Sequence, residues 1–342
     1  MKKIVKLAAA ISVFCITLLP LTAIASVMYS DIYAFGDSLS DVGNDFIITN
    51  STVPNPSIYT DGTYVGRFTN GPNYLDVLSG SLGLTLQPSL AGGTDYAYGG
   101  ARTNYIHPGL ASLGGLSFNQ QIAAYDSTHA VADSSALYVL WIGANDLADA
   151  IAATVQGDST AISQAIGTAM AGISNAIANL AGRGAQHFLV PNLPDLALVP
   201  QIGGLGSTGL NFLANLASTS FNTALDTTLD QSIFSALDIR NMDVFGLLNN
   251  IVANPGAYGL IDVEHACYTG EVDGSSLPGG PNPPTICADP SQYAFWDYEH
   301  PSATVHAELA ALAFAAVIPE PSTLALLVLG LSGVGFSLRK RA

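Results

Sequence analysis

Short apolar segments with strand character alternate along this chain with longer segments of helical periodicity. The expected strands are residues 32–35, 136–142, 188–190 and 238–244. Between the second and third strands lies an Ala-rich stretch, 159–180, whose apolar residues recur at helical spacing. Strands separated by helices in this way pair in parallel and are buried on both faces. The alternation therefore predicts an α/β fold with a central parallel sheet and helices on both sides.

The rest of the core is predicted from apolar spacing and from the positions of Gly and Pro. Helices are expected at 212–237, 245–253 and 303–317, and Ser302 is placed to cap the last one. Residues 50–71 and 270–290 are expected to form loops on opposite sides of the core. Once the two ends are set aside, about 290 residues remain, which is enough for one large domain, 26–317.

Residues 1–25 have the features of a secretory signal peptide. Three lysines precede an uncharged apolar run, 7–21, and Ala23-Ile24-Ala25 supplies small residues for cleavage. The alternative is an N-terminal membrane anchor, which the short run and the cleavage pattern disfavour. We therefore expect an exported protein, located in the periplasm, at the cell surface or outside the cell.

Charge is distributed very unevenly along the chain. Between residues 26 and 318 there are four arginines, no lysine and 25 acidic residues, which gives a formal charge of −21. A surface of this sign repels phosphate backbones, so no nucleic-acid partner is expected. The hydrophobic share of 49% also excludes a disordered acidic chain.

The last residues, 318–342, differ from the rest of the chain. Pro319-Glu320-Pro321 is followed by an uncharged apolar run, 324–338, and then by Arg339-Lys340-Arg341. A helix over this run is about 22 Å long, which is shorter than the roughly 30 Å hydrocarbon core of a bilayer. The basic cluster is typical of the cytoplasmic end of a membrane helix.

This order of features resembles the PEP-CTERM sorting signal of Gram-negative bacteria. The resemblance implies processing by an exosortase-type enzyme. The C-terminal transmembrane helix would then hold the protein in the inner membrane only transiently. A plain tail anchor is the alternative.

Two cysteines remain once Cys15, in the signal region, is set aside. Cys267 and Cys287 form an even pair in a chain expected to be exported, which favours a disulfide. Closing a loop of about 20 residues contributes around 3 kcal/mol in the chain-entropy model. The alternative is two unpaired thiols.

A serine and a histidine stand where nucleophilic catalysis would need them. Phe35-Gly36-Asp37-Ser38-Leu39 follows the first expected strand, and the glycine lets the chain turn and present the serine hydroxyl at the carboxyl edge of the sheet. Such a hydroxyl needs a base, usually a histidine held by a carboxylate. Asp297-Tyr298-Glu299-His300 lies just before the last expected helix, and Pro301 keeps His300 on a loop. Taken separately, the two segments would be a turn and a surface ion pair.

Two further segments offer hydrogen-bond donors to the negative charge that develops on a reacting carbonyl. Tyr98-Gly99-Gly100-Ala101 presents backbone N–H groups where no Cβ blocks approach. Gly143-Ala144-Asn145-Asp146 places an amide side chain at the end of the second expected strand. Each segment alone would be taken for a turn. No phosphate loop, dinucleotide fingerprint or metal-ligand cluster appears, so we expect no cofactor and no metal.

In this order, the four segments resemble the GDSL, or SGNH, family of esterases and lipases. The resemblance covers residues 31–316 and includes an extended match to the first family block, from Phe35 to Asn44. It implies a flavodoxin-like three-layer α/β/α sandwich. It also implies that Ser38 is the nucleophile, that His300 is the base and that Asp297 orients the histidine.

The resemblance further implies an oxyanion hole made by the backbone N–H of Ser38, the backbone N–H of Gly99 and the side chain of Asn145. The choice between Gly99 and Gly100 stays open. The expected substrates are carboxylic esters of fatty acids or small acyl groups. Phospholipase, acyltransferase and carbohydrate acetyl-esterase activity remain alternatives within the same machinery. An alternative of a different class is a non-catalytic cell-surface or matrix-binding protein that has kept the fold.

Overall fold

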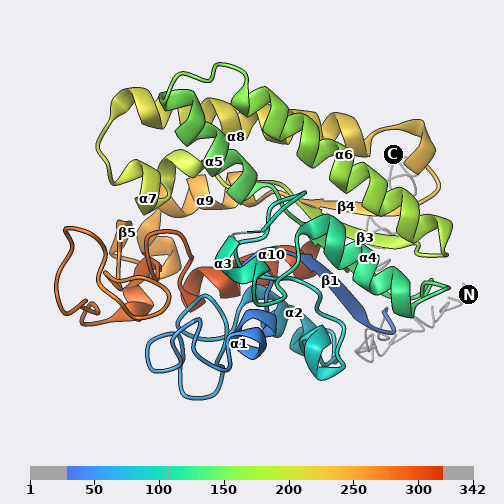
Figure 1. Ribbon diagram of the computed structural model, residues 1–342, viewed down its shortest axis with the longest axis horizontal. Helices are drawn as coiled ribbons and strands as arrows, with labels where there is room; N and C mark the ends of the chain where they lie inside the picture. The colour runs from blue at the N-terminus through green and yellow to red at the C-terminus, as the bar shows by residue number, and fades with distance from the viewer. Residues whose placement is uncertain (1–28, 107, 319–342) are drawn as a thin grey trace, which may run out of the picture.

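The computed structural model describes residues 29–106 and 108–318. Its centre is a parallel sheet in the order β1-β2-β3-β4, and all four strands coincide with predicted ones (Figure 1). The strands are β1 Ile32–Gly36, β2 Leu137–Trp141, β3 His187–Pro191 and β4 Asp238–Met242. The predicted signal peptide and the apolar run of the tail lie outside the described residues.

An irregular fifth segment, 94–98, extends the sheet beyond β1. Its backbone accepts a hydrogen bond from Ala34 at Thr94 and donates to Ala34 from Tyr96 and to Gly36 from Tyr98. The sequence did not predict this segment. Because it is second in the chain, the spatial order becomes 2-1-3-4-5, which is that of flavodoxin-like folds. The predicted α/β/α sandwich is therefore confirmed.

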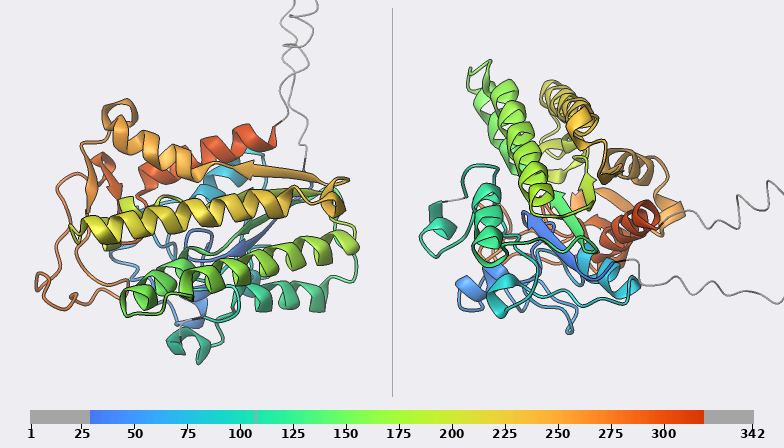
Figure 2. Two further views of the ribbon diagram at one scale, coloured as in Figure 1. Left: turned by 90° about the horizontal axis from the view of Figure 1, so that it is seen from above. Right: turned by 90° about the vertical axis from the view of Figure 1, so that its right-hand side faces the viewer.

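Helices cover the sheet on both faces, as expected for buried parallel strands (Figure 2). α4 packs on β1 and on α6, while α10 packs on α2, β3 and β4. The apolar core lies between these layers and includes fully buried strand residues such as Val139 and Leu189. The helices are α1 Asn44–Ile48, α2 Tyr74–Ser81, α3 Pro108–Ala111, α4 Phe118–Thr128, α5 Ala144–Val155, α6 Ala161–Gly182, α7 Pro200–Gly203, α8 Thr208–Leu229, α9 Val244–Ala253 and α10 Ala303–Val317.

All four predicted helices are found, and only one of them has bounds that differ clearly from the prediction. The helix expected at 212–237 is α8, which ends at Leu229 because the following residues turn into a 3₁₀ segment. α10 has the predicted bounds, and the Ser302 hydroxyl caps it by accepting from the Val305 N–H at 3.4 Å. Within the described residues, no helix is long and apolar enough to cross a membrane.

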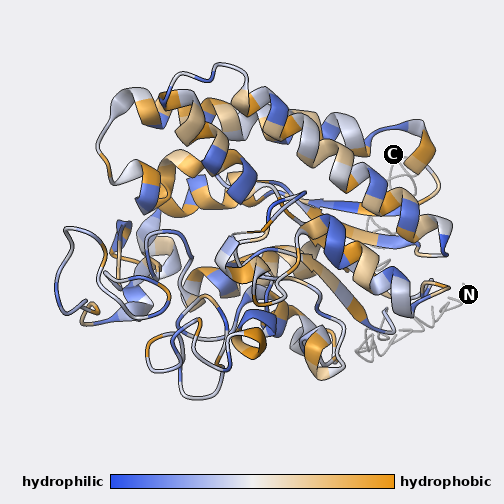
Figure 3. Ribbon diagram, viewed as in Figure 1, coloured by the Kyte–Doolittle hydropathy of each residue, from blue (hydrophilic) through white to orange (hydrophobic). Residues whose placement is uncertain are grey.

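The two predicted loops, 50–71 and 270–290, lie on the same side of the molecule, so the prediction of opposite sides is wrong (Figure 1). Asn55 joins them, because its backbone N–H donates to the Val272 carbonyl at 2.8 Å and its side chain donates to the Asp273 carbonyl at 3.0 Å. Both loops are coloured mostly hydrophilic or neutral in Figure 3. The two loops meet beyond the carboxyl ends of the strands, where they form one side of the site described below.

A second, two-stranded parallel sheet adjoins the 270–290 loop. It pairs β5, Asp262–Ala266, with β6, Tyr293–Phe295, and the sequence did not predict it. Its hydrogen bonding continues past both strands, from Cys267 N–H to the Phe295 carbonyl and from Tyr268 N–H to the Trp296 carbonyl. The structure joins Cys267 to Cys287 by a disulfide, with a Cα–Cα distance of 4.8 Å.

The close approach of β1 and β2 generates a testable stability prediction. A Cβ atom on Gly36 would lie 2.3 Å from the Trp141 carbonyl oxygen, a backbone atom that cannot move independently. Gly36→Ala should therefore lower the free energy of unfolding by about 1–3 kcal/mol, as overpacking does. Urea unfolding measures the change.

The matched control is Gly167→Ala in α6, where an added Cβ meets no atom within 4 Å. This change should raise the free energy of unfolding by roughly 0.5–1 kcal/mol, since alanine is the better helix former. Equal stability of Gly36→Ala and the native protein would contradict the packing described here.

Candidate active site

The structure brings Ser38, Asp297 and His300 together from opposite ends of the described chain. Ser38 follows β1, and His300 lies on the loop before α10, 262 residues later. The Nε2 atom of His300 is 2.9 Å from the Oγ atom of Ser38. Its Nδ1 atom is 2.7 Å from Oδ2 of Asp297. The arrangement is that of a serine, a base and an orienting carboxylate.

Local backbone hydrogen bonds fix the carboxylate of Asp297. Its Oδ1 accepts the N–H of Glu299 at 2.8 Å and the N–H of His300 at 2.7 Å. Both Asp297 and His300 are only 4% exposed. This short turn sets the imidazole above the carboxylate, which is what the D-x-x-H spacing provides.

Two aromatic residues of the 50–71 loop complete the surroundings of the histidine. The Tyr59 hydroxyl donates to Oδ2 of Asp297 at 2.7 Å. The Phe68 ring packs against the His300 ring with a centroid distance of 5.3 Å. Sequence reasoning missed both residues. The one sequence feature that could have indicated them is the presence of aromatic residues in the 50–71 loop, which is otherwise rich in Gly, Pro and polar residues.

Charge and burial act in opposite directions on the histidine and its carboxylate. Burial lowers the pKa of His300, but the charge of Asp297 and the hydrogen bond to it outweigh burial, so the pKa is raised above its ordinary value. Burial raises the pKa of Asp297, but His300 outweighs burial in turn, and the pKa of this carboxyl is lowered. Asp297 is therefore ionised, and it stabilises the imidazolium that forms when His300 takes a proton.

A buried carboxylate organises the turn that follows Ser38. Asp41 accepts four backbone N–H groups, those of Gly43 at 2.7 Å, Asn44 at 2.6 Å, Asp45 at 3.1 Å and Gly99 at 3.2 Å. Its own carbonyl accepts from the side chain of Asn73. Burial raises the pKa of Asp41 to about 6, against the lowering effect of these N–H groups.

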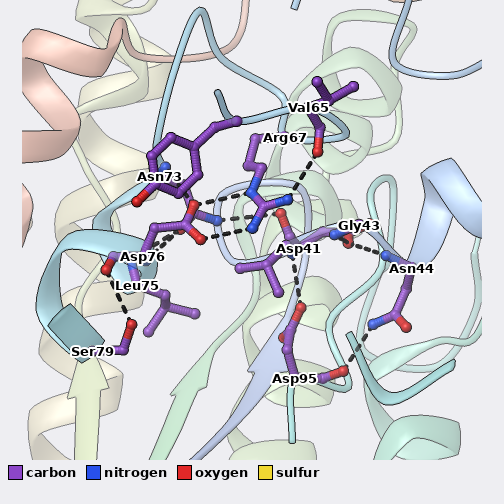
Figure 4. A network of polar contacts seen from close by, with 12 residues as sticks. Asp41, Gly43, Asn44, Val65, Arg67, Asn73, Leu75, Asp76, Ser79 and Asp95 are labelled. Atoms are coloured by element: carbon purple, nitrogen blue, oxygen red, sulfur yellow. Dashed lines mark hydrogen bonds and ion pairs between the residues drawn. The ribbon is translucent and has the colours of Figure 1, made fainter. Parts of the chain in front are cut away.

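The neighbouring groups extend this turn into a larger polar network (Figure 4). Asp95 accepts the Val42 N–H at 2.8 Å, and the Asn44 side chain donates to the Asp95 carbonyl at 2.8 Å. Arg67 forms a paired contact with Asp76 at 2.7 and 3.0 Å. The network connects the turn after Ser38 to the segment that contains Gly99.

The two adjacent glycines, Gly99 and Gly100, differ in their contacts. The N–H of Gly99 is engaged by Asp41, and a Cβ on Gly99 would lie 2.3 Å from Phe68 and 2.6 Å from Asp45. Gly100 has φ +68°, and no acceptor for its N–H, or for that of Ser38, is found among residues 29–106 and 108–318. Asn145, at the start of α5, holds the carbonyl of Ala101 with one amide hydrogen at 3.1 Å, which leaves its second hydrogen free.

A pocket opens beside Ser38, and a second, apolar pocket adjoins it. The first is bordered by Ser38, Asn145 and His300 on one side and by the loop after β3 on the other. Leu39, Pro194 and Val199 border both pockets. The second pocket reaches between α9 and α10 and is lined by buried apolar side chains such as Trp141, Leu248, Ile251 and Leu309. In the described part of the chain, no group of three or more His, Cys, Asp or Glu residues is arranged to hold a metal ion.

Comparison with known proteins decides the family. The family model for GDSL-like lipase/acylhydrolase proteins matches residues 32–313. The chain belongs to this family. The PEP-CTERM protein-sorting motif matches residues 317–341. The GDSL membership makes the chain a member of a hydrolase family of the esterase/lipase type, and the sorting motif is one of exported proteins.

Two curated relatives and one solved structure illustrate the similarity. The chain is 27% identical to a GDSL esterase/lipase of Arabidopsis thaliana, covering 79% of this chain and 82% of the relative. It is 26% identical to the phosphatidylcholine-sterol acyltransferase of Aeromonas hydrophila, covering 82% and 88%. A solved structure described as a GDSL-like lipase of Parabacteroides merdae is 11% identical, with a TM-score of 0.40 over 85% of this chain and 97% of that chain.

Two buried histidines, His300 in the site and His306 in α10, should titrate very differently. His300 should gain its proton at a pKa above about 6.5, because Asp297 favours the imidazolium. His306, in α10, accepts the Tyr74 N–H at 3.2 Å, and burial together with the charge of His300 lowers its pKa to about 3. Carbon-13 NMR of the imidazole Cε1 signals between pH 4 and 9 should show His300 titrating and His306 remaining neutral. A His300 signal that stays neutral down to pH 5 would contradict this description of the electrostatics.

Proposed function

We propose that the protein is an exported serine ester hydrolase that cleaves carboxylic esters through an acyl-enzyme on Ser38. The observation that supports this most strongly is the 2.9 Å contact between Ser38 Oγ and His300 Nε2, with Nδ1 of the same ring held by Asp297. A neutral imidazole in this position accepts the serine proton, which is the activation that a hydroxyl nucleophile needs.

In the proposed reaction, Ser38 Oγ attacks the ester carbonyl carbon while its proton passes to His300 Nε2. The tetrahedral intermediate collapses, the C–O bond to the alcohol breaks, and His300 returns the proton to the departing alcohol oxygen. Water then attacks the acyl-enzyme, giving up a proton to His300. The acid product leaves, and Ser38 regains its proton from His300. Asp297 stabilises the imidazolium and stays ionised throughout.

Three donors are proposed to stabilise the negative oxygen of the tetrahedral intermediate. They are the N–H of Ser38, a glycine N–H of the Gly99-Gly100 pair and the side-chain amide of Asn145. We assign the glycine donor to Gly100, because the Gly99 N–H already donates to Asp41 at 3.2 Å. Asn145 Nδ2 donates to the carbonyl of Ala101, the residue after Gly100, so the amide is tied to this segment of the chain. Preorganised donors of this kind contribute much of the rate in acyl transfer.

The adjoining apolar pocket supports an ester of an apolar acid as the substrate. An acyl chain held on Ser38 would pass Leu39 and Val199 to enter the space between α9 and α10. Burying each methylene there contributes about 0.8 kcal/mol. Fatty-acyl esters, including lipids, are therefore favoured over acetylated carbohydrates.

The rival proposal is a non-catalytic surface or matrix-binding protein, which the sorting motif at 317–341 favours. The site argues against it. Burial disfavours the charged forms of Asp297 and His300. A binding protein has no need of such a buried pair, nor of its alignment on a serine hydroxyl.

The proposed organisation keeps the boundaries expected from the sequence, and the family matches at 32–313 and 317–341 support its second and third parts. Residues 1–25 would direct export, 26–317 would form the catalytic domain and 318–342 would be the sorting tail. An exosortase-type enzyme would process the tail after its helix had held the protein in the inner membrane. We propose a final location in the periplasm, at the cell surface or outside the cell.

Replacing the nucleophile tests the proposed chemistry directly. Ser38→Ala should abolish hydrolysis of p-nitrophenyl esters while leaving the far-ultraviolet circular dichroism spectrum unchanged, since a half-buried hydroxyl contributes little to packing. Ser40→Ala is the matched control, because Ser40 bonds the Tyr74 hydroxyl and not His300. Residual turnover by Ser38→Ala at the native rate would overturn the assignment.

Removing one oxyanion donor should have a smaller effect. Asn145→Ala is expected to lower kcat by about 10²- to 10³-fold, the usual effect of losing one such donor, with little change in KM. Steady-state kinetics on one ester measure both constants. An unchanged kcat would remove Asn145 from the oxyanion hole.

Changing the depth of the apolar pocket should change acyl-chain preference in opposite directions. Leu248→Trp fills the pocket and should lower kcat/KM for long-chain esters while leaving acetate esters nearly unaffected. Leu248→Ala enlarges the pocket and should shift the preference toward longer chains. The measurement is kcat/KM over p-nitrophenyl esters of increasing chain length. Parallel changes for all chain lengths would show that the acyl chain lies elsewhere.

A further inference from the structure

The Tyr59 hydroxyl is a second donor to the carboxylate oxygen that holds His300. Oδ2 of Asp297 receives Nδ1 of His300 at 2.7 Å and the Tyr59 hydroxyl at 2.7 Å. Oδ1 is occupied by two backbone N–H groups. Tyr59 is only 1% exposed, so water does not compete for this hydrogen bond. Tyr59 is thus the only side chain besides His300 that donates to Asp297 within the described residues.

The Tyr59 ring is held by a small aromatic cluster, separate from the main core. Its neighbours are Tyr268 and Trp296, both in edge-to-face contact at centroid distances of 5.9 and 6.0 Å. Tyr268 and Trp296 stack on each other at 5.9 Å. Cys267 belongs to the same buried cluster, and Cys287 packs against it. The cluster therefore joins the 50–71 loop, the disulfide and the segment that carries Asp297.

Backbone hydrogen bonds fix the disulfide-bonded segment to the segment that leads into Asp297. Cys267 and Tyr268 donate to the carbonyls of Phe295 and Trp296 at 3.1 and 2.6 Å. The disulfide then closes the loop 267–287, and that loop accepts the Asn55 N–H from the neighbouring loop. The turn that precedes Tyr59 is therefore held on a covalently closed loop, because the Tyr59 N–H also donates to the Asn55 carbonyl at 2.8 Å.

We propose that Tyr59 is a positioning residue for Asp297, and that the loop closed by Cys267 and Cys287 holds Tyr59 in place. The proposal rests on the proposed function, in which Asp297 orients His300. It assigns a catalytic consequence to the disulfide and to the 50–71 loop, which lie more than 190 residues apart in the sequence.

The hydrogen bond has a predictable effect on the histidine. A donor to a carboxylate spreads its negative charge and weakens its pull on a neighbouring imidazolium. Removing the Tyr59 hydroxyl therefore leaves more of the charge of Asp297 for His300, and the pKa of His300 rises. Other ionisable groups also affect the pKa values of these residues. Glu299 and Asp37 act on His300, and Tyr268 and Glu299 act on Tyr59. None of them changes in the variants below except Tyr268, which is the control.

The deciding comparison is Tyr59→Phe against Tyr268→Phe. Tyr59→Phe keeps the ring and loses only the hydroxyl, so the aromatic cluster stays packed. We expect kcat to fall about tenfold or more with KM nearly unchanged, because the loss of a hydrogen bond to a charged group loosens Asp297. The acid limb of the kcat/KM profile should move to higher pH. Within the described residues, the Tyr268 hydroxyl bonds the Glu271 carbonyl alone, at 3.3 Å, so Tyr268→Phe should match the native protein in both respects.

An NMR titration of His300 makes the same comparison without substrate. The pKa of His300 should be higher in Tyr59→Phe than in the native protein and unchanged in Tyr268→Phe. The proposal is overturned if Tyr59→Phe has the native His300 titration, or if Tyr268→Phe shifts it equally. Absence of ester hydrolysis by the native protein would instead reject the proposed function, and the titration would still decide the position of Tyr59.

The disulfide is tested by its own variant. Cys267→Ser combined with Cys287→Ser should lower kcat and shift the His300 titration in the same direction as Tyr59→Phe, but less. Reducing the native protein with dithiothreitol gives the same comparison should the double variant fail to fold. Native kcat and native His300 titration after loss of the disulfide would overturn the part of the proposal that concerns the loop.

Discussion

The contact between Ser38 Oγ and His300 Nε2 depends on the whole architecture of the domain. It joins the end of the first strand to the start of the last helix, 262 residues apart. The sheet order places β1 at the switch point between the segment 94–98 and β2, where connections leave in opposite directions and a crevice opens. α10 packs across β3 and β4, which brings its N-terminal loop to the same edge. The proposed nucleophile, Ser38, and its proposed base, His300, therefore meet because of the strand order, although they lie 262 residues apart in the sequence.

Acidic residues outnumber basic residues in this chain, 26 to 10, so most carboxylates cannot pair with an arginine or lysine. Each of the four arginines of the described residues pairs with an aspartate, in the pairs Arg67–Asp76, Arg102–Asp149, Arg183–Asp126 and Arg240–Asp238. Two buried carboxyl groups near Ser38 are held instead by backbone N–H groups, four of them at Asp41 and two at Asp95. Buried charges need such partners to be tolerated. The same groups that stabilise the acidic turn also hold Gly99 against it, so stability and site geometry are linked.

Much of the fold could be predicted because its strands are short apolar runs between turn residues. Periodicity also defined α6 and α10, and the chemical blocks followed from the ends of predicted strands. Irregular elements could not be predicted in this way. The segment 94–98 pairs with β1 by only a few hydrogen bonds and contains a buried aspartate, Asp95, that breaks the apolar pattern. Tyr59 and Phe68 lie in a loop whose position depends on contacts with residues more than 200 positions away, which local sequence does not encode.

We propose that Ser38 becomes nucleophilic only when His300 is neutral. The most direct measurement is the rate at which a fluorophosphonate probe modifies the native protein between pH 4 and 10, with the modified residue located by mass spectrometry. The account predicts a single adduct on Ser38, and a rate that falls at acid pH along one ionisation whose pKa lies above about 6.5. An adduct on another residue, or a rate on Ser38 that is independent of pH down to pH 4, would contradict it.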